Sequence, residues 1–412
     1  MLSKYLSLVS KRCLDGYKPP VLPGKFDNII IAMSSGVDSS VAGSLFAGHF
    51  PNARGIYMQN WSESQSVNDP TKEKCYERDW NDVCKVGKRL NLPVDFVNFE
   101  NDYWIDVFEP MLSSYKDGYT PNPDIGCNRF VKFGKLVQHL DKKYGTGNYW
   151  LVTGHYARVM ESIKDGRTHL LKSYYKQKDQ SYYLSQIDEN VLTRLLFPIG
   201  NMTKPEVRHL AAEMNLYTAN KPDSQGICFV NNSQHGKFKN FLTHYLPDSI
   251  GDIITVDEVT GEKKVWGKHA GLWSYTLGQK VGISMPQGDP KYKGAWFISQ
   301  KLKETNQLVI VKGRDNPKLF QKNVELQSLK LLGLGKEEFQ KVIKLALDHG
   351  NLCMQYRSLQ EPIPVASCSF NETNDKITLC LHDEQRAIAQ GQFGCLYIGE
   401  RVLGSGTITR SW

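Results

Sequence analysis

Apolar runs and helical repeats alternate through the first part of the chain. Short apolar runs typical of strands buried on both faces occur at residues 29–31, 55–58, 94–99 and 150–153. Between them, apolar positions recur at helical spacing, at about residues 37–45, 76–90, 103–115 and 133–144. This order predicts an α/β fold with a doubly wound parallel sheet and helices on both faces.

After Phe241 the pattern changes to alternating strands. Segments such as DIITV and KKVWG predict a small central domain, which we expect over residues 223–292 after a catalytic domain over residues 25–222. Beyond Lys293, short strands with hairpin turns, AWFISQ and LVIVKG among them, predict a C-terminal antiparallel β-barrel over residues 293–412.

A loop rich in Ser and Gly, SSGVDSS, joins the first strand to the first helix. This layout directs backbone N–H groups at an anion over the start of the helix. The loop lacks the Gly-Lys-Ser/Thr ending of a Walker A loop, so we interpret it as a phosphate loop without the lysine that grips β- and γ-phosphates. A plain strand–helix turn with Ser as N-cap is the alternative. Met58 and Gly154-His155 also follow strands, and we expect them to share one nucleotide pocket with the loop.

Two of the nine cysteines lie in rigid polar loops. Cys127 follows the prolines of PNPDIGCNRF, three residues after Asp124, and Cys228 lies in KPDSQGICFV. We expect these two thiols to be reactive and the others to be inert. No zinc site is expected, because the chain has no Cys-x-x-Cys pair. The odd cysteine count and irregular spacing favour reduced thiols.

The N-terminus has the composition of an organelle import signal. Four basic residues accompany a single acid, Asp15, and apolar residues lie at helical spacing among serines. We interpret residues 1–24 as a mitochondrial presequence, with Pro19-Pro20 and Pro23 marking its join to the folded part. An ordinary N-terminal helix is the alternative.

Length and charge narrow the functional class. A chain of 412 residues is expected to form two or three domains. The excess of 51 Lys and Arg over 43 Asp and Glu gives a net charge of +8, which agrees with a polyanionic partner. No apolar run approaches the length of a membrane span, so no membrane partner is expected.

Five segments carry a resemblance to a known family. SSGVDSS, TPNPDIGCN, GHYARV, KDQSYYL and DSQGICFV occur in the order and at roughly the spacing found in tRNA-specific 2-thiouridylases. After the presequence the chain resembles the mitochondrial, fungal-like branch of that family over nearly its whole length. The resemblance implies a catalytic domain of the adenine nucleotide α-hydrolase type with a pyrophosphatase loop, a central domain that contacts tRNA, and a mitochondrial matrix location.

The resemblance also implies a reaction. ATP, with Mg²⁺ inferred from its chemistry, adenylates C2 of the wobble uridine in the tRNA anticodon stem-loop. A persulfide on Cys228, loaded by a cysteine desulfurase or a sulfur-relay protein, then delivers sulfur to C2. Cys127 is the nucleophile that resolves the persulfide through a transient disulfide with Cys228, and Asp124 assists proton transfer.

Other residues take their roles from the same resemblance. Those implied to contact ATP are Ala32, Met33, Ser34, Ser35, Gly36, Val37, Asp38, Ser39, Met58 and Gly154. Those implied to meet the flipped base are Asn122, Pro123 and Asp124. Those implied to contact tRNA are His155, Lys178, Asp179, Gln180, Tyr356 and Gln392. No residue is assigned to a metal.

The chain departs from the family pattern at two positions. Ser35 stands where the family usually has Gly, which costs about 1 kcal/mol if the position needs a positive φ. Gln355 stands where the family usually has Arg, so a phosphate contact is expected to be absent there.

Three other functions share part of this pattern. An adenylating amidotransferase or ligase that uses ammonia would share the ATP site and need neither Cys127 nor Cys228. A non-catalytic tRNA-binding protein would release no pyrophosphate from ATP. An RNA-free redox module would need only the two loop cysteines.

Overall fold

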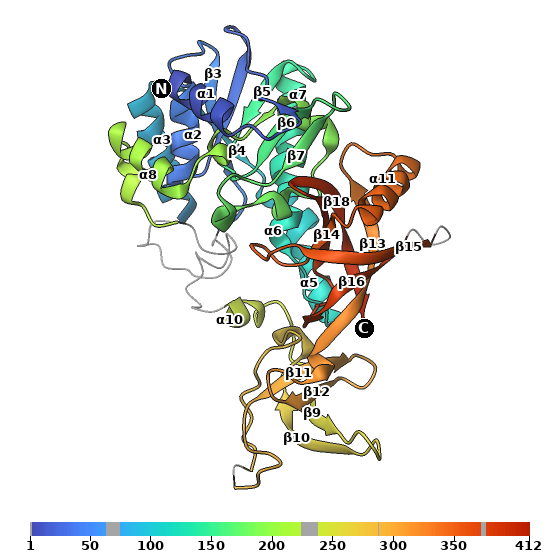
Figure 1. The fold of residues 1–412 in the computed structure, drawn as a ribbon. Helices are drawn as coiled ribbons and strands as arrows, with labels where there is room; N and C mark the ends of the chain where they lie inside the picture. The colour runs from blue at the N-terminus through green and yellow to red at the C-terminus, as the bar shows by residue number, and fades with distance from the viewer. Residues whose placement is uncertain (1, 63–74, 224–237, 287, 372–375) are drawn as a thin grey trace.

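The computed structural model describes residues 2–62, 75–223, 238–286, 288–371 and 376–412. Figure 1 shows a parallel-sheet domain at one end, a β-barrel packed beside it, and a small sheet at the far end of an elongated molecule. Among the described residues, no helix is long and apolar enough to cross a membrane.

A parallel sheet forms the centre of the N-terminal domain. Its strands run in the order β4-β3-β2-β5-β8, and every pair in it is parallel. The strands are β2 (Asn28–Met33), β3 (Ala53–Gln59), β4 (Val94–Asn98), β5 (Tyr149–Val152) and β8 (Leu195–Leu196). The first four confirm the sequence prediction. The two-residue β8 was missed because it is too short to show a pattern.

Helices cover both faces of this sheet, as predicted. Ile29 and Ile31 lie in one buried cluster, whereas Ile30 between them lies in another. Alternate side chains of a strand point to opposite faces, so a continuous apolar run is what a sheet covered on both sides requires. The helices on the Ile29 face are α2 (Val37–Phe46), α3 (Cys75–Leu90) and α8 (Lys204–Glu213). Those on the Ile30 face are α4 (Glu100–Tyr103), η2 (Trp104–Phe108), α5 (Glu109–Lys116) and α7 (Leu136–Tyr144).

The loop expected around Cys127 is instead largely helical. A helix begins at Pro123 and runs through α6 (Pro123–Gly126) and the π-helical η3 (Cys127–Lys135) into α7. Asn122 is its N-cap and accepts a hydrogen bond from the Ile125 N–H at 3.4 Å. Proline suits the first position of a helix because its missing N–H would have no partner there. The prolines therefore start a helix rather than fix an extended loop.

The C-terminal barrel has six strands. They are β13 (Phe320–Leu331), β14 (Leu352–Gln355), β15 (Ile363–Asn371), β16 (Lys376–Arg386), β17 (Phe393–Ile398) and β18 (Arg401–Ser411), and α11 (Lys336–Asp348) packs on them. Pairing between β17 and β18 closes the barrel, which confirms the antiparallel barrel expected from the sequence. Strands β1 (Tyr17–Lys18), β6 (Arg158–Ser162) and β7 (Thr168–Leu171) extend the same sheet from the N-terminal domain.

The central sheet has four strands in the order β10-β9-β12-β11. They are β9 (Gly251–Val256), β10 (Lys263–His269), β11 (Trp296–Leu302) and β12 (Gln307–Lys312). Strands β11 and β12 had been expected in the C-terminal barrel, but β12 pairs with β9 and thus belongs to the central unit. We therefore propose that the central domain extends to Lys312 rather than to residue 292.

Short helices complete the described part of the chain. They are α10 (Phe238–Leu242) and the 3₁₀ turns η4 (Lys176–Lys178), η5 (Ser181–Leu184), η6 (Glu189–Arg194), η7 (Pro198–Asn201), η8 (Tyr217–Asn220), η9 (Leu272–Ser274) and η10 (Pro317–Leu319).

The N-terminal helix α1 (Leu2–Lys11) packs into the core of the first domain. Tyr5 is 3% exposed and belongs to the same buried cluster as Ile29. Arg12, just after the helix, donates two hydrogen bonds of 2.8 Å to the Glu206 carboxylate and one of 2.7 Å to the Asn201 carbonyl. That residues 1–24 form a mitochondrial presequence stays a prediction; in the structure of the full chain, α1 packs against the first domain.

The packing of α1 predicts that Tyr5→Ala lowers the free energy of unfolding by about 3 kcal/mol, because it leaves a cavity in the core. The neighbouring Leu6 is 36% exposed. Leu6→Ala is the matched control and should cost less than about 1 kcal/mol. Thermal and urea unfolding of the two variants measure the difference. Equal effects would show that α1 does not pack as described.

The Arg12–Glu206 pair predicts a pH dependence of stability. Its hydrogen bonds lower the pKa of Glu206 from 4.5 to about 2. A carboxyl whose pKa is lowered by folding stabilises the protein above its unfolded pKa and loses that effect as pH falls through the folded one. The difference in melting temperature between the wild type and Arg12→Met should be constant above pH 4.5 and shrink towards pH 2. A difference that does not change with pH would contradict the pairing.

Candidate nucleotide and thiol site

The phosphate loop lies between the end of β2 and the start of α2. The Ser34 N–H donates to the Ser39 hydroxyl at 3.1 Å, and that hydroxyl donates to the Gly36 carbonyl at 3.1 Å. Gly36 is the N-cap of α2 and, among the described residues, no side chain caps this end. The first-turn N–H groups of a helix have no partner within it, so they are available to an anion here.

Ser35 has a backbone φ of +57°, the left-handed region that favours glycine. The departure from the family pattern at this position is therefore strained, as expected. The Ser35 hydroxyl donates to Asp79 of α3 at 2.7 Å and accepts from the Lys221 ammonium at 3.0 Å. These two hydrogen bonds offset the strain, because glycine could make neither.

Asp38, in the first turn of α2, is held by two groups. The Lys204 ammonium lies 2.8 Å from each of its carboxylate oxygens, and the Tyr156 hydroxyl donates to it at 3.0 Å. Lys204 also pairs with Asp223 at 2.8 Å. Ionic contacts thus connect the loop to α8 and to the segment after η8.

Gly154 is in direct contact with the phosphate loop. A Cβ at this position would lie 2.7 Å from the Ser39 backbone nitrogen and 2.8 Å from the Asp38 carbonyl carbon. Because β5 pairs directly with β2, the residues that follow the two strands meet. Only glycine allows this close approach.

His155 connects the nucleotide loop to the helix that carries Cys127. Its Nδ1 is 2.7 Å from the Thr153 hydroxyl, and its ring is 5.6 Å from the Phe133 ring of η3. Burial, and to a lesser extent the Lys132 charge, lowers the pKa of His155 well below its ordinary value. The imidazole is therefore neutral at physiological pH.

The other residues expected to contact ATP occupy the ends of β2 and β3. The side chains of Met33 and Val37 are buried in the core, so their backbones are the parts that face the loop. Ala32 and Met58 are partly buried against the opposite cluster. The loop, Met58 and Gly154 thus all lie at the carboxyl edge of the sheet, where the sequence analysis placed them.

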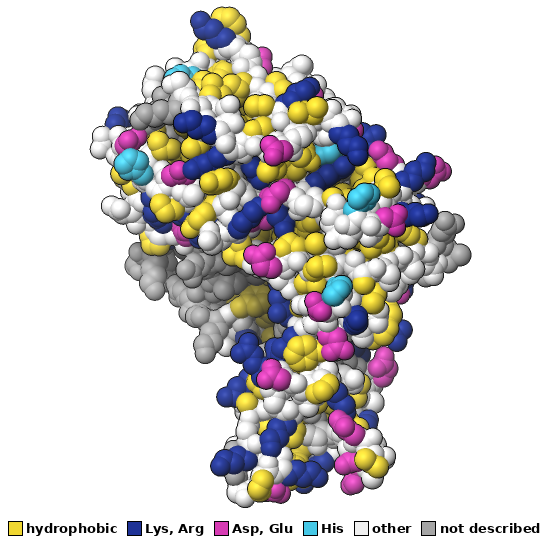
Figure 2. All heavy atoms as spheres, in the orientation of Figure 1, with side chains coloured by type: hydrophobic (Ala, Val, Ile, Leu, Met, Phe, Trp, Pro, Cys, Tyr) yellow, Lys and Arg dark blue, Asp and Glu magenta, His cyan; other side chains and the backbone are white. Residues whose placement is uncertain are grey.

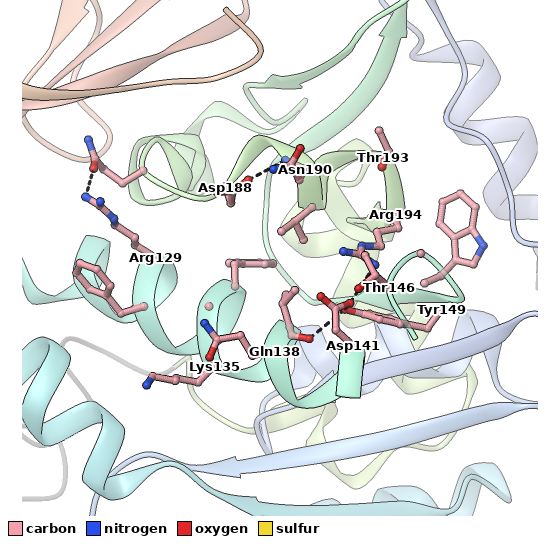
Figure 3. A pocket seen from close by; sticks show the side chains of 18 of the residues that line it. Arg129, Lys135, Gln138, Asp141, Thr146, Tyr149, Asp188, Asn190, Thr193 and Arg194 are labelled. Atoms are coloured by element: carbon pink, nitrogen blue, oxygen red, sulfur yellow. Dashed lines mark hydrogen bonds and ion pairs between the residues drawn. The ribbon is translucent and has the colours of Figure 1, made fainter. Parts of the chain in front are cut away.

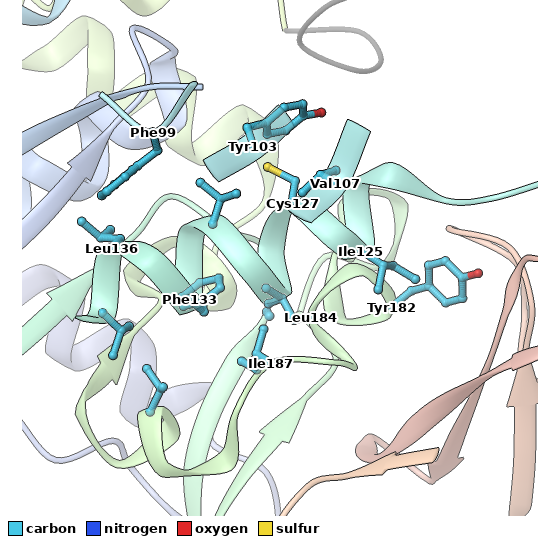
Figure 4. Packing of buried hydrophobic residues seen from close by; sticks show 14 of the residues in the cluster. Phe99, Tyr103, Val107, Ile125, Cys127, Phe133, Leu136, Tyr182, Leu184 and Ile187 are labelled. Carbon is cyan, nitrogen blue, oxygen red and sulfur yellow. The ribbon is translucent and has the colours of Figure 1, made fainter. Parts of the chain in front are cut away.

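Cys127 and Asp124 share one face of a helix, since they are three residues apart. Burial raises the pKa of Asp124, and the positive charge of Lys132 opposes that shift. Cys127 is 5% exposed, and Figure 4 shows its sulfur beside Tyr103 and Val107. Cys228 lies outside the residues that the structure describes. Of the two thiols, the structure therefore places Cys127 alone.

The sequence analysis missed most of the charged groups that surround the loop. Asp79, Lys204 and Asp223 contact the loop or its partners but come from segments far away in the sequence. The signal that could have pointed to the cations is the missing lysine of the loop itself, because phosphates need positive charge from elsewhere.

Comparison with known proteins identifies the family. A profile described as the tRNA methyl transferase HUP domain matches residues 27–232, its PRC-barrel counterpart matches residues 239–312, and an aminomethyltransferase beta-barrel profile matches residues 339–408. The mitochondrial tRNA-specific 2-thiouridylase 1 of Saccharomyces cerevisiae is 62% identical over 99% of this chain and 98% of its own length. The chain belongs to the tRNA-specific 2-thiouridylase family.

More distant similarities point to proteins that act on tRNA sulfur chemistry by name, a bacterial 2-thiouridylase and an archaeal thiolase. The tRNA-specific 2-thiouridylase MnmA of Lactiplantibacillus plantarum is 37% identical over 93% of this chain and 96% of its own. Among solved structures, the U34-tRNA thiolase NcsA of Methanococcus maripaludis is 15% identical, with a TM-score of 0.32 over 59% of this chain and 73% of its own. That likeness is too low to carry an argument.

Several residues that the 2-thiouridylase resemblance assigns to tRNA lie inside this structure. Tyr356 is 2% exposed, and its hydroxyl donates to the Arg386 carbonyl at 3.2 Å. Asp179 is buried and accepts from the Ser173 N–H and the Ser181 hydroxyl, each at 2.7 Å. These side chains organise loops rather than face the solvent, and the neighbouring Gln355 is buried as well.

The remaining residues of that set link separate segments. Gln392 of the barrel accepts a hydrogen bond from Asn122 at 3.3 Å, just before buried Pro123. Lys178 pairs with Asp223 at 2.8 Å. Gln180 accepts from the Tyr156 N–H at 2.9 Å. The resemblance thus marks positions where the helix that carries Cys127, the phosphate loop and the barrel meet.

A large cavity of about 1000 Å³ lies at the opposite edge of the sheet. It is lined by the start of β5, by η3, by α7 and by η6, with Arg194, Asp141 and Tyr149 joined by hydrogen bonds on its wall (Figure 3). Tyr149 is the first residue of β5, whereas Gly154 follows its end. The cavity is therefore separate from the nucleotide loop of this 2-thiouridylase-family protein.

The contact at Gly154 predicts that Gly154→Ala displaces the phosphate loop and weakens ATP binding at least about tenfold, the effect of losing one charge-assisted hydrogen bond. Gly282→Ala is the control, because a Cβ there meets nothing within 4 Å. Calorimetric titration with ATP measures the change. Unchanged affinity in a folded Gly154→Ala variant would show that the nucleotide binds elsewhere.

Proposed function

We propose that this protein is an ATP-dependent tRNA 2-thiouridylase that forms 2-thiouridine at the wobble position of mitochondrial tRNAs. The observation that carries the proposal is the junction at Gly154 and His155. One side of it touches the phosphate loop and the other packs on the helix of Cys127 and Asp124. His155 thus links the phosphate loop to the helix that carries a buried thiol, which suits activation followed by sulfur transfer. The 62% identity to a yeast 2-thiouridylase over the whole chain supports it.

The first step is activation of the uridine. The C2 oxygen attacks the α-phosphorus of ATP, the bond to the β-phosphate breaks, and pyrophosphate leaves with the bonding electrons. The product carries AMP on C2, which is a far better leaving group than the original oxygen. To reach the site, the base must leave its stack. The first-turn N–H groups of α2 are the donors that this chain offers to the phosphates.

The second step is sulfur transfer. The terminal sulfur of a Cys228 persulfide attacks C2, and AMP leaves with the oxygen. The Cys127 thiolate then attacks the inner sulfur, which releases 2-thiouridine and forms a Cys127–Cys228 disulfide. A thiol reductant restores the two thiols. Asp124, whose pKa is raised by burial, is suited to take the proton from Cys127.

We propose that Mg²⁺ arrives as a complex with ATP. Proteins usually bind this ion through substrate phosphates and one or two carboxylates. Asp38 lies at the loop, but both of its carboxylate oxygens already accept from Lys204, so it fits a metal poorly in the arrangement described. No step above is routed through the ion.

The tRNA and the sulfur donor are proposed partners, and the mitochondrial matrix is the proposed location. The related Saccharomyces protein is named as mitochondrial. Exposed lysines of the central domain, among them Lys263, Lys264 and Lys268, supply positive charge for a polyanion. Figure 2 shows many Lys and Arg side chains on the lower lobe, where the central sheet lies. The donor is a protein that carries a persulfide.

The mechanism predicts that Cys127→Ser separates the two steps. With unmodified tRNA, ATP and a persulfide donor, the variant should still release pyrophosphate but form less than about one hundredth of the wild-type 2-thiouridine, because the nucleophile is lost. Cys84→Ser, at an exposed position of α3, is the control and should behave as wild type. Mass spectrometry of nucleosides and a pyrophosphate assay provide the readouts. Absence of 2-thiouridine with the wild type, or full activity of Cys127→Ser, would refute the proposal.

A further inference from the structure

The phosphate loop has no lysine of its own, yet two ammonium groups reach it from later segments. Lys204, at the start of α8, contacts Asp38, and Lys221, directly after η8, donates to the Ser35 hydroxyl at 3.0 Å. Lys221 thus contacts the loop near the end of β2, and Lys204 contacts it at the start of α2.

The two lysines differ in how firmly they are held. Lys204 is nearly buried and lies between the carboxylates of Asp38 and Asp223, each at 2.8 Å. Its charge is balanced, and its role is to fix the first turn of α2. Lys221 keeps 29% of its side chain exposed and contacts Asp82 at 2.8 Å and Asp79 at 3.5 Å. Lys221 is therefore the lysine that can exchange a partner for a ligand at the loop.

We propose that Lys221 binds the β- and γ-phosphates of ATP and replaces the lysine that a Walker loop carries within itself. This inference rests on the proposed function, since it names the residue that completes the nucleotide site. Ser35 positions the ammonium beside the loop, which gives the strained serine a purpose that glycine could not serve. A compact ammonium suits phosphate as a point charge.

The carboxylates that now hold Lys221 keep other partners when it turns to a phosphate. Asp82 also accepts from Lys85 at 3.4 Å, and Asp79 still accepts from the Ser35 hydroxyl at 2.7 Å. The exchange leaves neither acid without a hydrogen bond. Lys221 can thus move from the two carboxylates to the more highly charged phosphates of ATP without leaving either carboxylate unpaired.

During activation of the uridine, Lys221 takes no part in proton transfer and only compensates charge. The bond between the α- and β-phosphates breaks, and the electron pair goes to pyrophosphate, whose charge the ammonium neutralises. AMP has no β- or γ-phosphate. Lys221 should therefore contribute to the binding of ATP and pyrophosphate but not to the binding of AMP. A lysine with only a structural role would affect the binding of all three ligands alike.

The test compares the affinities of ATP, inorganic pyrophosphate and AMP for full-length variants by calorimetry. Lys221→Met should weaken ATP and pyrophosphate binding about tenfold or more and change AMP binding less than about twofold, and Lys221→Arg should restore part of the loss. Lys88→Met is the control, because Lys88 is an exposed lysine of α3, the helix that also carries Asp79 and Asp82. It should leave all three affinities unchanged.

A second measurement uses the wild-type protein and does not depend on a variant that folds. An amine-acylating reagent should modify Lys221 less in the presence of pyrophosphate, whereas modification of the exposed Lys88 should not change. Peptide mass spectrometry measures both. Equal loss of ATP and AMP affinity in Lys221→Met, or no protection of Lys221, would overturn the inference. A wild-type protein that binds no ATP would instead overturn the proposed function.

Discussion

The close approach of Gly154 to the phosphate loop is the constraint on which the site depends. Because β2 and β5 are neighbouring parallel strands, the residues after them compete for the same space, and there is no room for a side chain at position 154. The next two residues are then fixed in place. Tyr156 donates to Asp38 in the first turn of α2, and His155 packs on Phe133 of the helix that carries Cys127. One backbone contact thus sets both the nucleotide loop and the thiol helix.

Paired charges hold the same loop from the outside. Asp223 pairs with Lys178, Lys204 and Arg208, each at 2.8 Å, and Lys204 continues the network to Asp38. These residues come from different segments of the chain, and each charge has a partner. A loop without its own lysine can therefore be surrounded by cations and still remain close to neutral before a nucleotide binds.

The sequence predicted the parallel sheet because its cause is local. Ile29, Ile30 and Ile31 form one apolar run, and a strand covered on both faces needs such a run. The assignment of β11 and β12 failed for a different reason: alternation identifies a strand but does not say which sheet it joins. PNPD was interpreted as a rigid loop because of its prolines, although Asn followed by Pro is also a pattern of helix starts; the hydrogen bond from the Ile125 N–H to the Asn122 side chain shows that a helix begins there.

Composition was also ambiguous at the N-terminus. A basic amphipathic helix has the same pattern whether it is a leader or part of the folded domain, and the pattern did not predict that Tyr5 is buried in the core. The roles carried over by resemblance show a similar limit. Matching motifs led to the phosphate loop and to Gly154, which meet at one edge of the sheet, but motifs cannot distinguish a residue that touches RNA from one that positions its neighbours.

The contacts between the barrel and the helix that carries Cys127 show why that distinction matters. The Thr120 N–H donates to the Gln390 carbonyl and Gln392 donates to the Thr120 carbonyl, both at 2.9 Å, immediately before the helix begins at Pro123. Tyr182 adds hydrogen bonds to the Tyr356 and Phe393 carbonyls at 3.3 and 3.1 Å. The barrel therefore supports the N-cap of the helix that carries Asp124 and Cys127. Since a shift of that cap would move both side chains together, the C-terminal domain can determine the geometry of sulfur transfer without contributing a reacting atom.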